Sequence, residues 1–566
     1  MEIMFDFLSD LDLDDSFSEC KFKVTPPEVP NIEYMELPLR LDLDFINAGN
    51  IHCRTLKIRD GAVIKFCNMQ YFGSIVAKNA KLEFDYCDFF SLQGNTNQVL
   101  FDFDDCEVIF RNCIFNSGFK NIIECYNDTT IEASECQFFG TFESMVKMRS
   151  KCYLMTKNSF FLGQCSSCFY LETSCELCSE LCKYNYGKNV CSLKHSKCSF
   201  KNDEISEFDN LAELNGSMCS ISSCLVLHLR KSALMMDKSD AEIIKTQFEY
   251  FSLNGIVQLA FSSITIFDSI FRCIEFPCIT SFNQSMVFIF NTSFIDCNNG
   301  AIILKSDSSG YISNSTFKNT NESFIRMADS QNTIISKCKF IGKCESSVTL
   351  CDFADVLIKK CCFLNDNGIG IDVFCGAKST SKNIEFKGGY STEINIHHAG
   401  SFIGDTINIA SSNNDNIESH IVCQTKRDFI LSNICLNDKK IHDIKEHYKS
   451  RVIKSKNNKL CCSCDQEFST LRLFPCGHSV SFQTKDKSKC SLCRSMVQAH
   501  QCFFNAFCCP NNKKCIICET NEYDCLIVPC GHPICKKCWR ISRRLYHYCP
   551  TCRKSNVQMI RIVPYE

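Results

Sequence analysis

The 566-residue sequence lacks the features of a membrane-bound, secreted or nucleic-acid-binding protein. No uninterrupted apolar stretch reaches the roughly 18 to 20 residues that a membrane-spanning helix needs. The opening residues are acidic and have no basic region leading into an apolar run, so no secretory signal is visible. A formal net charge of −3 gives no overall electrostatic reason to bind nucleic acid or an anionic membrane. We therefore expect an intracellular, cytoplasmic protein that binds neither nucleic acid nor a membrane. The same observations are compatible with a nuclear protein.

Cysteine, in contrast, is unusually abundant, with 46 residues. The role of these cysteines depends on whether the protein resides in a reducing or an oxidising compartment. In a reducing cytoplasm we expect zinc ligands near the C-terminus and small apolar core residues elsewhere. A secreted, disulfide-bonded protein is the alternative. A chain of this length with 45% hydrophobic residues can bury a large core and should hold more than one domain.

The middle of the chain repeats itself every 23 residues. The aromatic positions of the repeat are Phe248, Phe271, Phe294, Phe317, Phe340, Phe363 and Phe386, and Ile409 continues the series. Five residues before them stand Ile243, Ile266, Ile289, Ile312, Ile335 and Ile358, and two residues before them stand Thr246, Ser269, Thr292, Ser315, Cys338 and Cys361. The same pattern occurs upstream at Phe115, Phe138 and Phe160. A fixed period of this size is typical of a solenoid.

Within each repeat, pairs such as Ile264 and Ile266 alternate as strand residues do. Three short strands per repeat, rich in β-branched and aromatic residues, predict a mainly β protein built as a parallel β-helix. The repeats resemble the right-handed β-helices of the pectate-lyase superfamily and its noncatalytic relatives over residues 41–436, most clearly from about 241 to 410. Between Cys175 and Asp240 the period slips, so we expect longer loops or a discontinuity there.

The segments around the repeats are predicted to cover the ends of the rod, because bare terminal strands invite edge-to-edge pairing. Residues 1–40 begin with apolar residues interleaved with aspartates, which predicts either a cap or a docking peptide for a partner. In residues 437–459, apolar side chains from Ile441 onward recur at helical spacing among lysines. This spacing predicts a cap or spacer helix.

Residues 511–566 hold four tight pairs of zinc-type donors: Cys515 and Cys518, Cys530 and His532, Cys535 and Cys538, and Cys549 and Cys552. Four such donors hold one tetrahedral zinc, so eight supply two sites. The order and the gaps resemble a RING finger. The resemblance implies that the first and third pairs share one zinc and that the second and fourth share the other. Protein would fill every coordination position, so both metals would be structural.

The residues around these donors resemble RING-type ubiquitin ligases, which bring a ubiquitin-charged conjugating enzyme to a substrate. The resemblance makes Ile517 and Pro550 contacts for the conjugating enzyme. It makes Arg553 the linchpin that hydrogen-bonds both ubiquitin and that enzyme. One departure is Trp539, which follows the sixth ligand directly, whereas the family's groove tryptophan lies a few residues later. We therefore expect Trp539 to be a core residue.

The tail Gln558–Glu566 is apolar and ends in an aromatic residue, Tyr565. It resembles the tails of the MDM and IAP type of RING, in which the tail adds a strand to a dimer and its aromatic residue touches ubiquitin. The resemblance implies a homodimer through the RING tail. A monomeric RING is the alternative.

Residues 460–510 contain a second, incomplete set of donors. Cys461 (or Cys462) with Cys464, Cys476 with His478, and Cys490 with Cys493 reproduce pairs one, two and four of the C-terminal set. Ser481 and Thr484 stand where the third pair would be. One further zinc site is expected from Cys476, His478, Cys490 and Cys493, and the pair Cys461 and Cys464 is a weaker candidate. The tetrapeptide Pro-Cys-Gly-His, at 475–478 and again at 529–532, indicates duplication followed by loss.

Five cysteines inside the repeat region also have zinc-like spacing: Cys165, Cys168, Cys175, Cys178 and Cys182. They fall where a coil of the solenoid should be. Because residues i and i+3 of a strand face opposite ways, we expect buried thiols here rather than a metal site.

Together these patterns predict a RING-type ubiquitin-protein ligase with a noncovalent mechanism. Its partners would be a ubiquitin-charged conjugating enzyme, ubiquitin and an unknown protein substrate held by the β-helix. One alternative is a zinc-dependent scaffold with an inert RING. Another is a carbohydrate-active β-helix, which needs clustered carboxylates with Arg or Lys on an outer face. The sequence by itself places no such cluster.

Overall fold

The computed structural model describes the chain almost continuously from residue 51 to residue 437. The gaps within that span are 92–97, 164, 252–255, 259, 398–399, 411–419 and 424–428. The other described residues are 35–37, 40–44, 439–441, 471–474, 479–480, 499–502, 525–528, 533–535, 537–539 and 558–561. Most of the predicted N-terminal segment, residues 1–40, therefore lies outside the described residues. Among the described residues no helix is long and apolar enough to cross a membrane.

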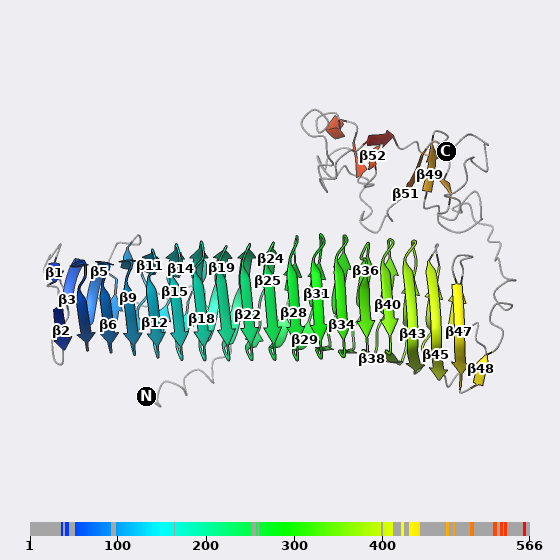
Figure 1. Ribbon diagram of the computed structural model, residues 1–566, viewed down its shortest axis with the longest axis horizontal. Coiled ribbons are helices and arrows are strands. Elements are labelled where there is room, and N and C mark those ends of the chain that lie inside the picture. Colours follow the sequence, from blue (N-terminus) through cyan, green and yellow to red (C-terminus); the bar gives the residue numbers. More distant parts are fainter. Residues whose placement is uncertain are drawn as a thin grey trace, which may run out of the picture.

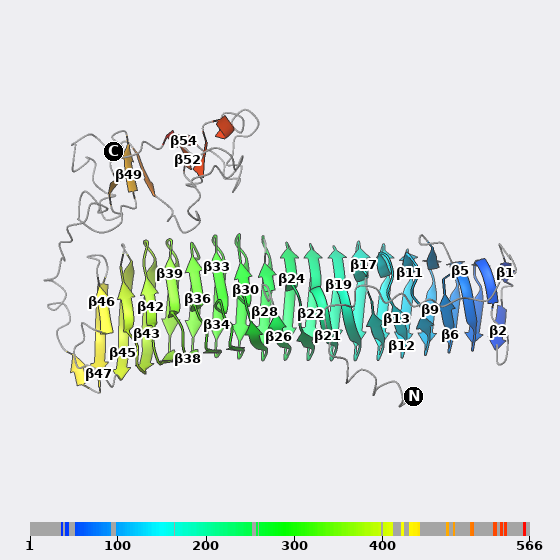
Figure 2. The ribbon, with the colours of Figure 1, turned by 180° about the vertical axis from the view of Figure 1, so that it is seen from behind.

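The main body is a parallel β-solenoid of about 15 turns, with about 23 residues per turn (Figures 1 and 2). This confirms the predicted mainly β fold and its period. Each turn contributes strands to three faces, and each strand pairs in parallel with its counterparts in the coils before and after it. Successive coils therefore lie about 4.8 Å apart, and equivalent residues stack in columns along the rod.

Three groups of strands make up the faces of the rod. Face 1 consists of β2 (Arg40–Asp44), β4 (Val63–Cys67), β6 (Lys81–Asp85), β9 (Glu107–Arg111), β12 (Thr130–Ser134), β15 (Tyr153–Lys157), β18 (Glu176–Glu180), β20 (Lys197–Lys201), β22 (Met218–Ser222), β25 (Asp240–Ile244), β28 (Ser263–Phe267), β31 (Met286–Phe290), β34 (Ser309–Ser313), β37 (Thr333–Ser336) and β40 (Asp355–Lys359). Face 2 consists of β7 (Asp88–Phe90), β10 (Ile114–Phe115), β13 (Gln137–Phe139), β16 (Phe160–Leu162), β23 (Leu225–Leu227), β26 (Gln247–Phe251), β29 (Ile270–Ile274), β32 (Ser293–Ile295), β35 (Thr316–Lys318), β38 (Lys339–Gly342) and β41 (Cys362–Asn365). Face 3 consists of β1 (Met35–Leu37), β8 (Val99–Asp104), β11 (Asn121–Tyr126), β14 (Ser144–Arg149), β17 (Ser167–Glu172), β24 (Ser232–Asp237), β27 (Ile256–Gln258), β30 (Ile279–Ser281), β33 (Ile302–Lys305), β36 (Ser323–Ala328), β39 (Ser346–Cys351), β42 (Ile369–Val373), β44 (Thr392–Ile396) and β46 (Ile421–Cys423).

Longer strands run through two faces. β3 (Ile51–Ile58), β5 (Gln70–Lys78), β19 (Lys183–Lys194) and β21 (Glu204–Asn215) join faces 2 and 3, and β43 (Lys378–Lys387), β45 (Ser401–Ala410) and β47 (Phe429–Leu436) join faces 1 and 2. Inward-facing residues of all three faces form one continuous hydrophobic core along the rod.

The predicted phenylalanine series is a stacked ladder in this core. Phe248 pairs in register with Phe271, and the series continues coil by coil to Phe386 and Ile409. Neighbouring rings lie nearly parallel, with centroids 4.9 Å apart for Phe248 and Phe271 and 4.7 Å apart for Phe363 and Phe386. The predicted isoleucine column is buried in the same way, from Ile243 to Ile358. Stacking on the neighbouring coils therefore removes part of the surface of each ring from water.

The predicted small-residue column is also buried, and its hydroxyl groups satisfy backbone groups at a corner of the rod. The Oγ of Ser269 accepts a hydrogen bond from the backbone N–H of Thr246 (3.2 Å) and donates one to the carbonyl of Phe267 (2.7 Å). Two coils further along the same column, the Oγ of Ser315 accepts from the backbone N–H of Thr292 and donates to the carbonyl of Ser313. Such residues bend the chain without leaving a buried polar group unpaired.

One position of the upstream repeat differs from the prediction. Phe138 pairs with Phe161, not with Phe160, and the rings of Phe138 and Phe161 stack at 4.6 Å. Phe161 is fully buried, whereas Phe160 points away from the core and is half-buried. The side chains of a strand alternate between its two faces, so only one of two adjacent phenylalanines can enter the ladder.

Residues 175–240 contain no break, contrary to the expectation of longer loops or a discontinuity. Leu177 pairs with Cys198 and Cys198 with Cys219, so two successive coils have 21 residues each. In these coils β19 and β21 continue from face 2 into face 3 as single strands. A positive φ at Tyr186 bends β19 where other coils have a separate turn. The period slips because these coils are shorter.

The C-terminal end of the solenoid finishes in a hairpin. β48 (Lys439–Ile441) pairs antiparallel with β47, with Leu436 opposite Lys439, and Asn437 in the turn has a positive φ of 47°. The prediction of a helix from Ile441 is therefore wrong at its first residue, and the rest of 437–459 lies outside the described residues. The antiparallel strand pairs with the last parallel edge, which would otherwise be open to other strands.

Candidate zinc-binding module

Two small antiparallel sheets lie in the part of the chain where the zinc donors were predicted. In the C-terminal one, β52 (Cys525–Val528) pairs with β53 (Pro533–Ile534) and with β54 (Gln558–Arg561). In the upstream one, β49 (Leu471–Phe474) pairs with β50 (Ser479–Val480) and with β51 (Ala499–Cys502). Both have three strands with the first strand in the centre.

The two sheets correspond strand by strand. Leu471 pairs with Val480 in the upstream sheet, and Cys525 pairs with Ile534 in the C-terminal one, 54 residues further along the chain at both positions. In each copy the tetrapeptide Pro-Cys-Gly-His lies between the first two strands. In each copy the third strand begins six residues after the last predicted ligand, Cys493 or Cys552. The shared topology supports an internal duplication, and the described strands of the upstream copy form the same three-stranded sheet although its sequence lacks the third donor pair.

The third donor pair of the C-terminal copy lies within the described residues. Cys535 and Cys538 are both buried, and a single helical turn at 537–539 brings them to the same side. The backbone N–H of Cys538 donates a hydrogen bond to the Sγ of Cys535 (3.4 Å). Such a hydrogen bond to sulfur stabilises a thiolate, which is the form that binds zinc. This arrangement fits half of a tetrahedral zinc site.

Trp539 is buried beside this pair, with 6% of its surface exposed, as expected for a core residue. Its backbone N–H donates to the carbonyl of Cys535 (3.0 Å) and closes the turn around the pair.

The remaining predicted site residues lie outside the described residues. They are Cys515, Cys518, Cys530, His532, Cys549 and Cys552 of the C-terminal set, the contacts Ile517, Pro550, Arg553 and Tyr565, and Cys461, Cys464, Cys476, His478, Cys490 and Cys493 of the upstream set. Within the part of the chain that the structure does describe, no three His, Cys, Asp or Glu side chains form a metal-binding group. The first four tail residues, Gln558–Arg561, pair with β52 of the same chain.

The five cysteines of zinc-like spacing in the solenoid occupy coil positions, as expected. Cys165, Cys168, Cys175 and Cys182 are buried in the core, and Cys178 is half-buried on the outer side of face 1. Burial raises the pKa of the Cys168 thiol well above its ordinary value, so this thiol stays protonated. A protonated buried thiol behaves as a small apolar core group.

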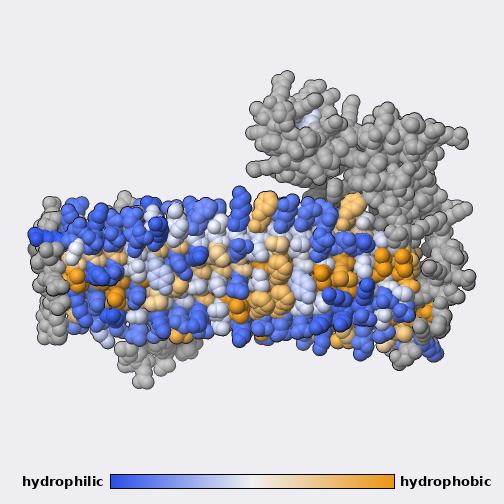
Figure 3. All heavy atoms as spheres, in the orientation of Figure 1, coloured by the Kyte–Doolittle hydropathy of each residue, from blue (hydrophilic) through white to orange (hydrophobic). Residues whose placement is uncertain are grey.

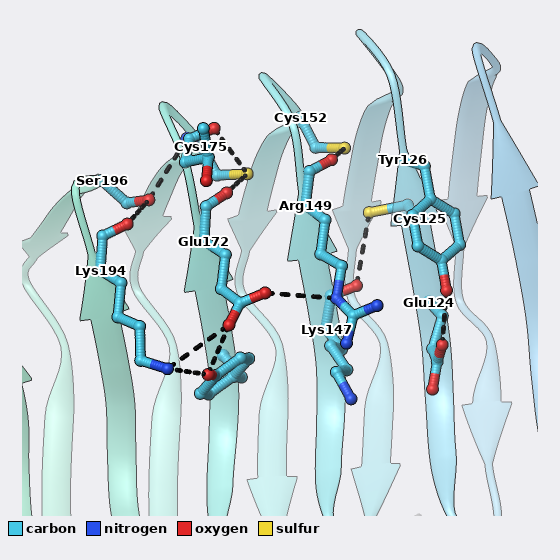
Figure 4. Close-up of polar contacts among 12 residues, drawn as sticks. Glu124, Cys125, Tyr126, Lys147, Arg149, Cys152, Glu172, Cys175, Lys194 and Ser196 are labelled. Carbon is cyan, nitrogen blue, oxygen red and sulfur yellow. Dashed lines mark hydrogen bonds and ion pairs between the residues drawn. The ribbon is translucent and has the colours of Figure 1, made fainter.

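Face 3 carries a cluster of charged side chains that the sequence reasoning missed (Figure 4). Glu172 is bonded to Arg149 (3.3 Å), to Lys194 (3.5 Å) and to the hydroxyl of Tyr170 (2.7 Å). The Tyr170 hydrogen bond, with Lys194 and Arg149, holds the pKa of Glu172 below its ordinary value. The near-23-residue spacing of Arg149, Glu172 and Lys194 is the signal that could have located this cluster.

The same cluster is relevant to the carbohydrate-active alternative. That chemistry requires a carboxyl group free to exchange a proton with a substrate. Glu172 is instead held ionised by partners from the coils on both sides. Glu124, two coils upstream of Glu172, accepts hydrogen bonds from Tyr126 (2.7 Å) and Asn121 (2.6 Å). The ion pairs of Glu172 join neighbouring coils, whereas the hydrogen bonds of Glu124 lie within β11.

Comparisons with known proteins agree with both parts of this architecture. Residues 254–416 match the family described as "Right handed beta helix region", and residues 511–559 match "Zinc finger, C3HC4 type (RING finger)". No curated protein sequence matches the chain.

Similar solved structures are β-helical. One is the catalytic unit of a thermostable GH87 α-1,3-glucanase from Streptomyces thermodiastaticus, at 7% identity and a TM-score of 0.20, covering 71% of this chain and 62% of the glucanase chain. Another is the periplasmic alginate epimerase AlgG, at 8% identity and a TM-score of 0.19, covering 68% and 77%. The A-module of the Azotobacter vinelandii mannuronan C-5 epimerase AlgE6 has 9% identity and a TM-score of 0.15, covering 72% and 91%. Values this low say nothing about the activity of this chain. The two family matches and the observed fold together identify the chain as a right-handed parallel β-helix joined to a C-terminal RING-type zinc finger.

Proposed function

We propose that the protein is a RING-type ubiquitin-protein ligase. The observation that carries this proposal is the full set of eight donors within the RING-matched residues 511–559. Its described pair, Cys535 and Cys538, has the burial and the N–H···S hydrogen bond of a zinc-binding turn.

In this proposal zinc has a structural role, because eight protein donors leave no open coordination position for substrate or water. The folded finger binds a ubiquitin-charged conjugating enzyme. Ile517 and Pro550 supply apolar contacts to that enzyme. Arg553 hydrogen-bonds both the enzyme and ubiquitin and holds the thioester in an attack-ready geometry. The contribution to rate is one of positioning.

Two zinc ions are proposed for the C-terminal finger and one for the upstream copy, at Cys476, His478, Cys490 and Cys493. The matching strand registers of the two copies support the upstream site, because the tetrapeptide that carries Cys476 and His478 follows the same strand in both. The upstream copy lacks the third pair, so it is proposed to support the intact finger and to be inactive alone.

The solenoid is proposed to hold the protein substrate, since a rod of stacked coils presents long ladders of exposed side chains. The runner-up is a zinc-dependent scaffold with an inert RING. The two differ only in ubiquitin transfer, so activity separates them.

The test is a self-ubiquitylation assay of the full-length chain with a panel of conjugating enzymes. The proposal expects chains with at least one enzyme, and a loss of at least about tenfold in Arg553→Ala and in Ile517→Ala, about 1.4 kcal/mol or more of transition-state stabilisation. Arg326→Ala, at an exposed position of β36 on the solenoid, is the control and should retain activity. Chain formation that persists unchanged in both Arg553→Ala and Ile517→Ala would reject the assignment of these residues. No chains with any enzyme would favour the scaffold.

A further inference from the structure

The outer surface of face 1 changes character along the rod. In its upstream half the outward positions are charged and paired across coils, as in Lys81 with Glu107 (2.7 Å) and Lys201 with Glu180 (2.9 Å). From β28 to β40 about half of the outward positions are instead apolar or aromatic, and every strand contributes at least one. We define these as the aromatic strip: Phe267, Phe288, Phe290, Tyr311, Ile334 and Leu357. Figure 3 shows hydrophobic side chains gathered on this face near the middle of the rod.

Three rings of the aromatic strip are in contact along the rod. Phe267 and Phe290 stack with centroids 4.9 Å apart, and Tyr311 lies 5.6 Å from Phe290. Each is half-buried by its neighbours, and Met286 beside them is 46% exposed. A contiguous apolar surface of this kind on a folded protein marks an interaction site.

The two long edges of the aromatic strip carry opposite charges. Along the turns that enter face 1 lie Asp307, Asp329, Asp352 and Asp355. Along the turns that leave it lie Lys337, Lys359, Lys360 and Lys382. The exceptions on the acidic edge are Lys305, which lies over the Phe282 ring, and Lys378, which is paired with Asp355 (3.8 Å). The exception on the basic edge is Asp268 at its upstream end.

This arrangement is complementary to itself in one orientation. A two-fold axis parallel to the rod places the strip of a second copy against that of the first and sets each basic edge opposite an acidic one. It also keeps equivalent coils level, so that Lys359 lies across from Asp355 of the other copy. A two-fold axis across the rod would instead set lysines against lysines. We propose that the aromatic strip is the interface of a parallel homodimer, with a second copy of this chain as its occupant.

The dimensions are compatible with a stable interface. The strip and its flanking coils extend roughly 30 Å along the rod and about 17 Å across a five-residue strand, or roughly 500 Å² in projection. The two charged edges add to this and bring the buried surface toward the roughly 800 Å² per partner of a standard interface.

The parallel orientation has a consequence for the zinc finger. Both chains leave their solenoids at Ile441, at the same end of the dimer. The solenoid interface thus raises the effective concentration of one finger relative to the other. This consequence rests on the proposed function, whereas the dimer itself does not.

Sedimentation equilibrium of the full-length, zinc-loaded chain tests the proposal. The wild type should dimerise, and the double variant Phe288→Glu/Phe290→Glu should raise the dissociation constant by about 100-fold or more, since it buries four charges in the apolar centre. The matched control is Ile270→Glu/Ile295→Glu, which changes outward residues of face 2 near the same coils and should leave the constant unchanged. Far-UV circular dichroism confirms that each variant keeps its β-fold.

The charged edges test the orientation. Lys359→Glu should weaken the dimer by about 2–5-fold, and Asp355→Lys added to it should restore affinity because each edge then faces its complement again. A monomeric wild type, or a dimer indifferent to Phe288→Glu/Phe290→Glu because the RING tail alone holds it, overturns the proposal. A stronger dimer in Lys359→Glu overturns the parallel orientation. None of these measurements depends on ubiquitin transfer, so failure here is distinct from failure of the ligase assay.

Discussion

A single acidic residue interrupts the small-residue column of the core. Asp203 stands between Cys182 and Cys224, at a position where other coils have serine, threonine or cysteine. Only 2% of its surface is exposed, and its Oδ1 accepts a hydrogen bond from the backbone N–H of Cys182 (2.6 Å). Burial raises the pKa of Asp203 from 3.8 to about 6, and the hydrogen bonds with the Cys182 backbone, the Ser179 side chain and the Lys201 backbone offset this cost only in part.

The raised pKa of Asp203 predicts how its contribution to folding stability depends on pH. The folded chain holds the Asp203 proton more tightly than the unfolded chain, so the contribution of Asp203 to stability is greatest below about pH 4 and is lost as pH rises through about 6. Asp203→Asn keeps the acceptor and removes the charge, and should stabilise the chain at pH 7.5 by about 1–3 kcal/mol. Urea denaturation midpoints at pH 4 and pH 7.5 measure the effect. Asp240→Asn, on the outer surface, is the control. An equal midpoint for Asp203→Asn and wild type at pH 7.5 would show that the buried charge of Asp203 does not destabilise the chain.

Cysteine has two roles in this chain, and substitution by serine should separate them. Cys361 occupies the core column in which Ser315 stands in another coil, so Cys361→Ser should keep the fold and the full zinc content. Cys538→Ser removes a proposed ligand and should lower the bound zinc by about one ion per chain. Elemental analysis of the purified full-length variants gives the count. Equal zinc in both variants would contradict the assignment of Cys538.

At the scale of the strand and the coil, a regular repeat is what made the fold predictable. Identical residues stack only when their spacing equals the length of a coil, so the 23-residue phenylalanine series located the ladder correctly. The same reasoning missed the 21-residue coils, because β19 and β21 omit a turn without changing the kind of residue in the core. It also missed the ion-pair cluster of Glu172, since pairing across coils depends on which residues face outward at each position.

The strand β16 offers a direct test of which side chains point into the core. Phe161→Ala removes a ring from the stack between Phe138 and Tyr184 and should destabilise by about 3–5 kcal/mol. Phe160→Ala changes the adjacent, outward-facing ring and should cost less than about 1 kcal/mol. Because a solenoid can unfold in parts, the comparison uses the midpoint of chemical denaturation, followed by circular dichroism. Equal losses in the two variants would contradict the register of β16.

For the whole molecule, the solenoid and the C-terminal finger could be predicted from the sequence, but the structure of the upstream copy could not. Hydrophobic ladders and donor spacing are local in sequence, so they predicted the solenoid and the C-terminal finger. Whether the upstream copy retains the RING sheet could not be predicted, because donor loss by itself is equally compatible with an unfolded segment. The identical pairing of β49–β51 and β52–β54 answers that question for the backbone.

The two parts should respond differently to removal of metal. The solenoid is held by a continuous hydrophobic core, whereas a small zinc finger gains of order 10 kcal/mol of its folding free energy from each ion. A strong chelator applied to the full-length chain should therefore release zinc and abolish ubiquitin chain formation, while the β-sheet signal in circular dichroism keeps most of its amplitude. Restored zinc should restore activity, whereas magnesium should not, because thiolates prefer zinc. Loss of the β-sheet signal together with zinc would show that the rod depends on metal and would contradict a core built from stacked coils alone.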